Sequence, residues 1–169
     1  MLETPEELDR LQELLDASMA SAGPHLRGII AEERRLGAPA LAERLQGLCL
    51  LVLATVTADG RPLTAPADGY FLHGTFWFSL GADAVRARHL RARPQVSATY
   101  LPGEDLAVTV HGAAEWFPIR HPACAELRRA MLDEYVPKQG PSFGEWLENV
   151  EAVGARIVPD RAFTFRLAG

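Results

Sequence analysis

Lysine, cysteine and long apolar runs are all scarce in this chain of 169 residues. The longest apolar run, Leu48 to Ala54, is far shorter than the roughly 18 residues that a membrane-spanning helix needs. The two cysteines, Cys49 and Cys124, are far apart and lack metal-type spacing, so we expect two buried thiols. Lys138 is the single lysine, and nearly all basic charge therefore comes from arginine.

An excess of positive charge is also missing. The formal net charge is −5 and the pI is about 5.5, which argues against broad binding to nucleic acid or to an anionic membrane. The first ten residues, MLETPEELDR, are acidic and lack the pattern of an export signal, so we expect a cytoplasmic protein. With 48% hydrophobic and 23% charged residues, the chain has the composition of a globular protein.

Common catalytic motifs are absent as well. The sequence holds no P-loop, HExxH or CxxC motif and no dinucleotide-binding glycine pattern, and no serine sits on a hydrolase elbow. The five histidines never fall at i and i+4 on one helix, and none pairs with an acid at metal-site spacing. We therefore expect no metal site and assign no catalytic residue.

The amino-terminal part of the chain predicts helices. Apolar residues at spacings of three and four predict a helix from Pro5 to about Ala20, with a capping box at Thr4 and Glu7. A second helix is expected from His25 to Leu36, and a third, short one from Pro39 to Leu45. We assign residues 1–46 to a helical amino-terminal extension and residues 47–169 to a second domain.

The second domain predicts antiparallel strands with helices between some of them. Expected strands are 48–57, 62–71, 75–79, 96–100, 106–117, 155–158 and 162–167, and expected helices are 83–93, 122–135 and 143–151. Asp83 should cap the first of these helices, Gly112 should bulge its strand, VPKQGPS should form a loop, and Pro159-Asp160 should turn the chain. About six to seven strands predict a mainly β fold, a small closed barrel with peripheral helices.

One arginine-rich segment stands out. Residues 80–103 hold a single acid against four arginines, which are Arg86, Arg88, Arg91 and Arg93. The helix that carries them should begin close to Phe78 and Ser79, where the aromatic strand ends. Arginine, helix-start amides and a serine hydroxyl are the donors that hold a phosphate group. The alternative is a solvated helix face whose arginines reflect genome composition.

The strand Arg61 to Ala67 contains two prolines, which remove ladder donors and favour an edge or a bulge. Its free backbone could hydrogen-bond a flat heterocycle, and the alternative is a barrel corner without a ligand. Nearby aromatic side chains could wall a planar cofactor, although alternate ones must face the core. These aromatics are Tyr70, Phe71, Phe76, Trp77 and Phe78.

The order and spacing of four segments resemble the FMN-binding split-barrel family that includes pyridoxamine 5′-phosphate oxidase. These segments are ATVTADGRP, the aromatic strand ending in Ser79, RARHLRARP and HGAAE. The resemblance covers residues 48–117, and the tail ARIVPDRAFTFRL is similar to the closing strands of the family. It implies a split β-barrel and a homodimer with two cofactor sites at the subunit interface.

The resemblance also implies cofactor-binding residues. Arg86 matches the basic ligand of the FMN phosphate, and Ser79 matches a hydroxyl near that phosphate. Thr64, Ala65 and Pro66 match the strand whose backbone lines the isoalloxazine ring. Phe78, Arg88 and His89 complete the candidate set.

The implied function is an oxidoreductase that transfers a hydride between FMN and a small planar substrate. Ala65 and Tyr70 stand where the oxidase itself carries basic side chains, so we expect a substrate other than pyridoxamine phosphate. Tyr70, His73 and His111 are candidate proton donors, although a structural role is expected for each. The alternatives are a deazaflavin-dependent reductase on the same barrel, and a non-enzymatic flavin-binding or interaction protein.

Overall fold

The computed structural model describes residues 2–167, so Met1 and residues 168–169, at the outer ends of the two predicted regions, lie outside it. Within the described range six antiparallel strands close into a barrel in the order β1-β2-β3-β6-β5-β4. The strands are β1 (Leu48–Val56), β2 (Pro62–Leu72), β3 (Thr75–Gly81), β4 (Gln95–Tyr100), β5 (Leu106–Pro118) and β6 (Ala152–Arg166). The predicted class, a mainly β barrel with peripheral helices, is confirmed.

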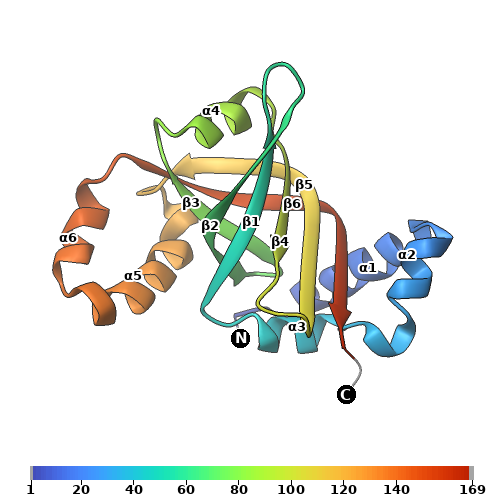
Figure 1. Cartoon of the computed structure of the whole chain (residues 1–169). Helices are drawn as coiled ribbons and strands as arrows, with labels where there is room; N and C mark the ends of the chain where they lie inside the picture. The colour runs from blue at the N-terminus through green and yellow to red at the C-terminus, as the bar shows by residue number, and fades with distance from the viewer. Residues whose placement is uncertain (1, 168–169) are drawn as a thin grey trace.

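The helices lie around this barrel. They are α1 (Pro5–Ser21), α2 (Pro24–Ile29), α3 (Ala38–Arg44), α4 (Val85–Ala92), α5 (Ala125–Gln139) and α6 (Ser142–Asn149), with short 3₁₀ turns η1 (Glu32–Arg34) and η2 (Pro122–Cys124). Figure 1 shows α4 at the top beside the β1–β2 hairpin, α5 and α6 on the left, and the amino-terminal helices at the bottom and right. No helix within residues 2–167 has the length and apolar character that a bilayer crossing requires.

The amino-terminal helices share the core of the barrel. The predicted capping box at Thr4 and Glu7 is present at the start of α1. Leu11 and Leu15 of α1 belong to the same buried cluster as the barrel interior. The predicted second helix is too long, because Ile30 leaves the helical conformation and is buried. Gly28, a weak helix former, lies just before this point, and the residues that follow form η1 in place of a longer helix.

Alternation along the strands decides which side chains fill the barrel. Phe76 and Phe78 on β3 face inward and are fully buried, whereas Trp77 between them faces outward under α5. Cys49 lies in the barrel core and Cys124 lies in the cluster under α5, so the prediction of two buried thiols is confirmed.

The last strand differs from its prediction. β6 is continuous, so the predicted turn at Pro159 and Asp160 is wrong. His111 pairs with Arg161 and Gly112 pairs with Pro159, which leaves Asp160 as the extra residue of a bulge. The pairing is irregular at Gly112, as predicted, but the extra residue belongs to β6 and not to the strand of Gly112. This bulge lets β6 bend around the barrel where a turn was expected.

The helical pair after β5 also differs. α5 continues through Pro137 to Gln139, so most of the predicted loop VPKQGPS is helical. Pro137 stands in the last turn, where the helix soon ends at Gly140 with a φ of 84°. α6 begins two residues later, and the two helices form a hairpin beside β2 and β3 (Figure 1).

Candidate cofactor and ligand site

The barrel is closed, but part of β2 has no strand partner on its β3 side, which leaves a local opening between β2 and β3. Strand β2 pairs with β1 from Pro62 to Tyr70, but it pairs with β3 only from Gly69 to Leu72. Residues 62–68 therefore have a free edge on the side of β3, as the two prolines in this segment predict. On its other edge, β3 pairs with β6 from Trp77 to Gly81.

One arginine side chain of α4 lies across this free edge. Arg86 Nη1 donates to the carbonyl oxygen of Pro66 at 2.8 Å and to that of Ala65 at 3.4 Å. The side chain is half-buried, and burial lowers the pKa of Arg86 below its ordinary value. Its contacts within residues 2–167 use Nη1 alone, so the Nε and Nη2 hydrogens remain available for an anion.

The start of α4 adds further donors. The N-cap residue is Ala84 and no side chain caps the helix, so the predicted cap by Asp83 is wrong. A turn closed by the Ala84 N–H and the Gly81 carbonyl at 3.0 Å holds Asp83 one residue before the cap position. The amides of the first helical turn, next to Arg86, thus have no capping side chain and can bind an anion.

The other predicted site residues divide between this edge and the rest of the fold. Thr64 is exposed on β2 beside Ala65 and Pro66. Ser79 faces outward from β3 and is half-buried, at the point where β3 separates from β2. The structure thus gathers Arg86, Ala65, Pro66 and Thr64 closely and places Ser79 farther along the same opening.

Three predicted residues lie away from the edge. Arg88 is exposed and donates to the Asp83 carbonyl at 2.7 Å. His89 has its Nδ1 atom 3.2 Å from the hydroxyl of Thr55. Phe78 is fully buried, so its side chain packs the barrel core and cannot touch a ligand at the opening. The alternation on β3 accounts for this, since Ser79 points outward and its neighbour must point inward.

A groove that the sequence reasoning missed begins at Ser79. This α5–α6 groove has a volume of about 560 Å³ and lies between the barrel and the helical hairpin. It is lined by Asp68, Ser79, Met131, Tyr135, Gln139, Ser142, Phe143 and Trp146. The centroids of the Tyr135 and Phe143 rings are 4.9 Å apart and those of the Phe143 and Trp146 rings are 5.2 Å apart, so the three form one aromatic wall.

A polar contact joins the groove to β2. The hydroxyl of Tyr135 donates to Asp68 Oδ2. Burial, with added effects of the hydrogen bond and charge of Asp68, raises the pKa of Tyr135 to about 12, so the phenol stays protonated at neutral pH. Asp68 follows Pro66 by two residues, which places both side chains on one face of β2, about 7 Å apart along the strand.

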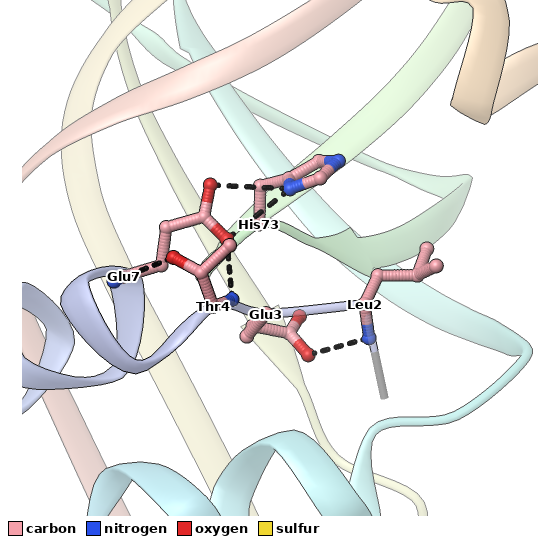
Figure 2. Close-up of polar contacts among 5 residues, drawn as sticks. All are labelled: Leu2, Glu3, Thr4, Glu7 and His73. Atoms are coloured by element: carbon pink, nitrogen blue, oxygen red, sulfur yellow. Dashed lines mark hydrogen bonds and ion pairs between the residues drawn. The ribbon is translucent and has the colours of Figure 1, made fainter.

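The candidate proton donors lie elsewhere. Tyr70 is buried under α5, and its hydroxyl has no hydrogen-bond partner among the described residues. His73 lies in the β2–β3 turn, and its Nδ1 atom is 3.2 Å from Glu7 Oε1. Figure 2 shows the two side chains facing each other. His111 lies 2.7 Å from the hydroxyl of Ser97 on the outer face of the barrel. None of the three lines the α5–α6 groove.

Two other site types find no support. Within residues 2–167 no group of three or more histidine, cysteine, aspartate or glutamate side chains could hold a metal ion. The prediction that the sequence lacks a hydrolase motif overlooked the segment 140–144, GPSFG, which has GxSxG spacing. This segment lies between α5 and α6 and includes the first turn of α6. A nucleophile elbow needs a strand before the turn, so Ser142 does not occupy one.

A closed six-stranded barrel with a local opening beside β2, and with an arginine across that opening, has the arrangement of a split-barrel protein. A family model described as pyridoxamine 5′-phosphate oxidase matches residues 38–157, and the chain belongs to this family. The resemblance inferred from the sequence is thereby confirmed. No curated protein matches the chain.

Solved structures share the fold at low sequence identity. A conserved hypothetical protein from Mycobacterium tuberculosis is 23% identical with a TM-score of 0.64, and the match covers 80% of this chain and 88% of that one. The heme storage protein HutZ from Vibrio cholerae is 22% identical with a TM-score of 0.62, covering 78% and 97%. An F420 reductase is 19% identical with a TM-score of 0.54, covering 70% and 91%.

Proposed function

We propose that this chain is an FMN-binding oxidoreductase that transfers a hydride between the flavin and a small planar substrate. The observation that carries the proposal is the Arg86 guanidinium, which lies across the free edge of β2 with donors left over for a phosphate group. Membership of the pyridoxamine 5′-phosphate oxidase family supports it.

The donors around Arg86 fit a flavin phosphate. A guanidinium fork and the uncapped amides of α4 offer several N–H groups to one anion. Thr64 and Ala65 provide free backbone for the edge of a heterocycle, and Ser79 provides a hydroxyl farther along the opening. When bound, the flavin supplies the redox chemistry, and the chain supplies binding, orientation and charge.

We also propose a homodimer that pairs through the outer face of β1. Leu50 and Val52 point outward from this strand and are 60% and 51% exposed. No helix lies in front of β1 in Figure 1. Val52 pairs in register with Pro66, whose carbonyl Arg86 holds, so a partner covering Val52 would also border the proposed cofactor site.

A deazaflavin coenzyme is the second candidate cofactor, because the fold is shared with an F420 reductase. The same phosphate donors at Arg86 would serve it. A non-enzymatic role is the third candidate, because the fold is also shared with a protein described as a heme storage protein.

Titration of the purified protein with FMN, with the deazaflavin coenzyme and with hemin, followed by fluorescence quenching, separates these candidates. We expect FMN to bind most tightly and Arg86→Ala to weaken that binding at least tenfold. Arg91→Ala is the matched control, because Arg91 is on the same helix and also donates to a backbone carbonyl, that of Ala82 at 2.7 Å. Equal FMN affinity for Arg86→Ala and the wild type would contradict the phosphate assignment.

A further inference from the structure

We propose that the α5–α6 groove binds a planar aromatic cation and discriminates against phosphorylated or other anionic aromatics. The proposal rests on the proposed function and names its substrate class, because the groove begins at Ser79, next to the proposed flavin site. It combines two observations, an aromatic wall and a single carboxylate.

The aromatic wall provides the planar selectivity. Trp146 is 51% exposed and packs against Phe143, which in turn packs against Tyr135. The volume of about 560 Å³ lies within the range of about 300 to 1,000 Å³ that is usual for small-molecule sites. Exposed aromatic faces attract flat rings by stacking and cations through the ring quadrupole.

The charge selectivity comes from Asp68. Among the described residues that line the groove, it is the single charged side chain. Its Oδ2 atom accepts the hydrogen bond from Tyr135, which leaves Oδ1 to accept an N–H group of a ligand. Lys138 lies over the Tyr135 ring, but it is ion-paired with Glu134 and does not offset Asp68. A partly enclosed carboxylate attracts a cation and repels an anion.

The positive charge of Arg86 and the negative charge of Asp68 meet β2 at different positions. Arg86 is held at the Pro66 carbonyl, and Asp68 follows Pro66 by two residues. An anionic group is therefore drawn to the start of α4, whereas a cationic group is drawn into the groove. The substrate that names the family carries a phosphate, and the lining of this groove offers that group no cationic partner.

Three probes that share one ring test the charge preference. 1-Methylnicotinamide is a cation, nicotinamide is neutral and nicotinate is an anion. Each is titrated into the flavin-free protein by isothermal calorimetry, so the result does not depend on flavin binding. We expect affinity to fall in that order, with at least a tenfold difference between the cation and the anion.

Variants locate the binding. Asp68→Asn keeps an acceptor for the Tyr135 hydroxyl and removes the charge, so it should bring the three affinities within about threefold of one another. Trp146→Ala should weaken binding of the cation at least fivefold. Asp133→Asn makes the same charge change on the exposed surface of α5. Trp116→Ala removes an indole that is 43% exposed and lies outside the groove. Both variants should leave the affinities unchanged.

The outcomes are distinct. Nicotinate binding as tightly as 1-methylnicotinamide, an unchanged order in Asp68→Asn, or no binding of any probe would overturn the proposal. If the protein binds FMN but does not prefer the cationic probe over the anionic one, the groove assignment fails and the flavin function stands. If the protein prefers the cationic probe over the anionic one but does not bind FMN, the groove binds cations and the proposed flavin function fails.

Discussion

Replacing Val52 by arginine should break the proposed dimer. Fully burying a valine side chain contributes about 2 kcal/mol, and Val52 is 51% exposed in the single chain, so a partner would gain about 1 kcal/mol by covering it. A two-fold interface contains the residue twice, which gives about 2 kcal/mol, or about a 30-fold weaker dimer. Desolvation of two guanidinium groups at the same place would weaken it further.

Sedimentation analysis over a dilution series measures this effect. Val158→Arg is the matched control, because Val158 is 50% exposed on β6 and lies away from β1. We expect Val158→Arg to remain dimeric at concentrations where Val52→Arg is monomeric, and FMN affinity to fall with loss of the dimer. A monomeric wild type at micromolar concentration, or a Val52→Arg protein as dimeric as the control, would refute the reasoning.

Three further predictions test the fold and its titrating groups. Burial raises the pKa of Cys49 to about 12, so the folded protein should not react with Ellman's reagent at pH 8, and rapid labelling of Cys49 would show that the barrel opens. Burial pushes the pKa of Glu7 upward, but hydrogen bonds with Thr4 and His73 outweigh it and hold that pKa below 4.5. The ionised Glu7 side chain therefore stabilises the folded protein above pH 4.5. This stabilisation is lost as the pH falls through the lowered pKa of the folded state. Glu7→Gln should flatten this acid loss in urea unfolding between pH 3 and 6, and an unchanged slope would count against the contact. A Cβ on Gly112 would lie 2.2 Å from the Val158 carbonyl oxygen, so Gly112→Ala should cost about 3 kcal/mol in urea unfolding. Gly23→Ala, which meets no atom within 4 Å, should change stability by less than about 0.5 kcal/mol, and equal losses in the two variants would contradict the bulge packing.

The strands could be located from the sequence because their signals are local. Alternating apolar residues fix the period, and glycine fixes the turns, as at Gly60 and Gly74 with φ of 83° and 77°. The wrong predictions concern elements whose conformation depends on contacts between residues far apart in the sequence. Ile30 leaves its helix to be buried, and β6 passes Pro159 without a turn because Gly112 on β5 accommodates the bulge. Neither contact can be predicted from the residues next to it in the sequence.

The two halves of the candidate site differ in the same way. Arg86 could be found because four arginines in one segment of an acidic chain form a local signal, which the resemblance then made specific. The α5–α6 groove could not be found, because its aromatic wall combines Tyr135 of one helix with Phe143 and Trp146 of the next. Their meeting depends on the hairpin angle between the helices, and Asp68 meets them from a strand that ends about 60 residues earlier.

The partial pairing of β2 connects these observations. From Gly69 onward β2 is fixed to both neighbours, but before it the strand is held by β1 on one side alone. Its open side is then held by side chains from elsewhere, Arg86 at Pro66 and Tyr135 at Asp68. Two strand positions, about 7 Å along β2, separate the Pro66 carbonyl that Arg86 holds from the Asp68 side chain. The chain would therefore hold the anionic group of a coenzyme at Arg86 and the cationic group of a substrate at Asp68, at two separate points of one strand.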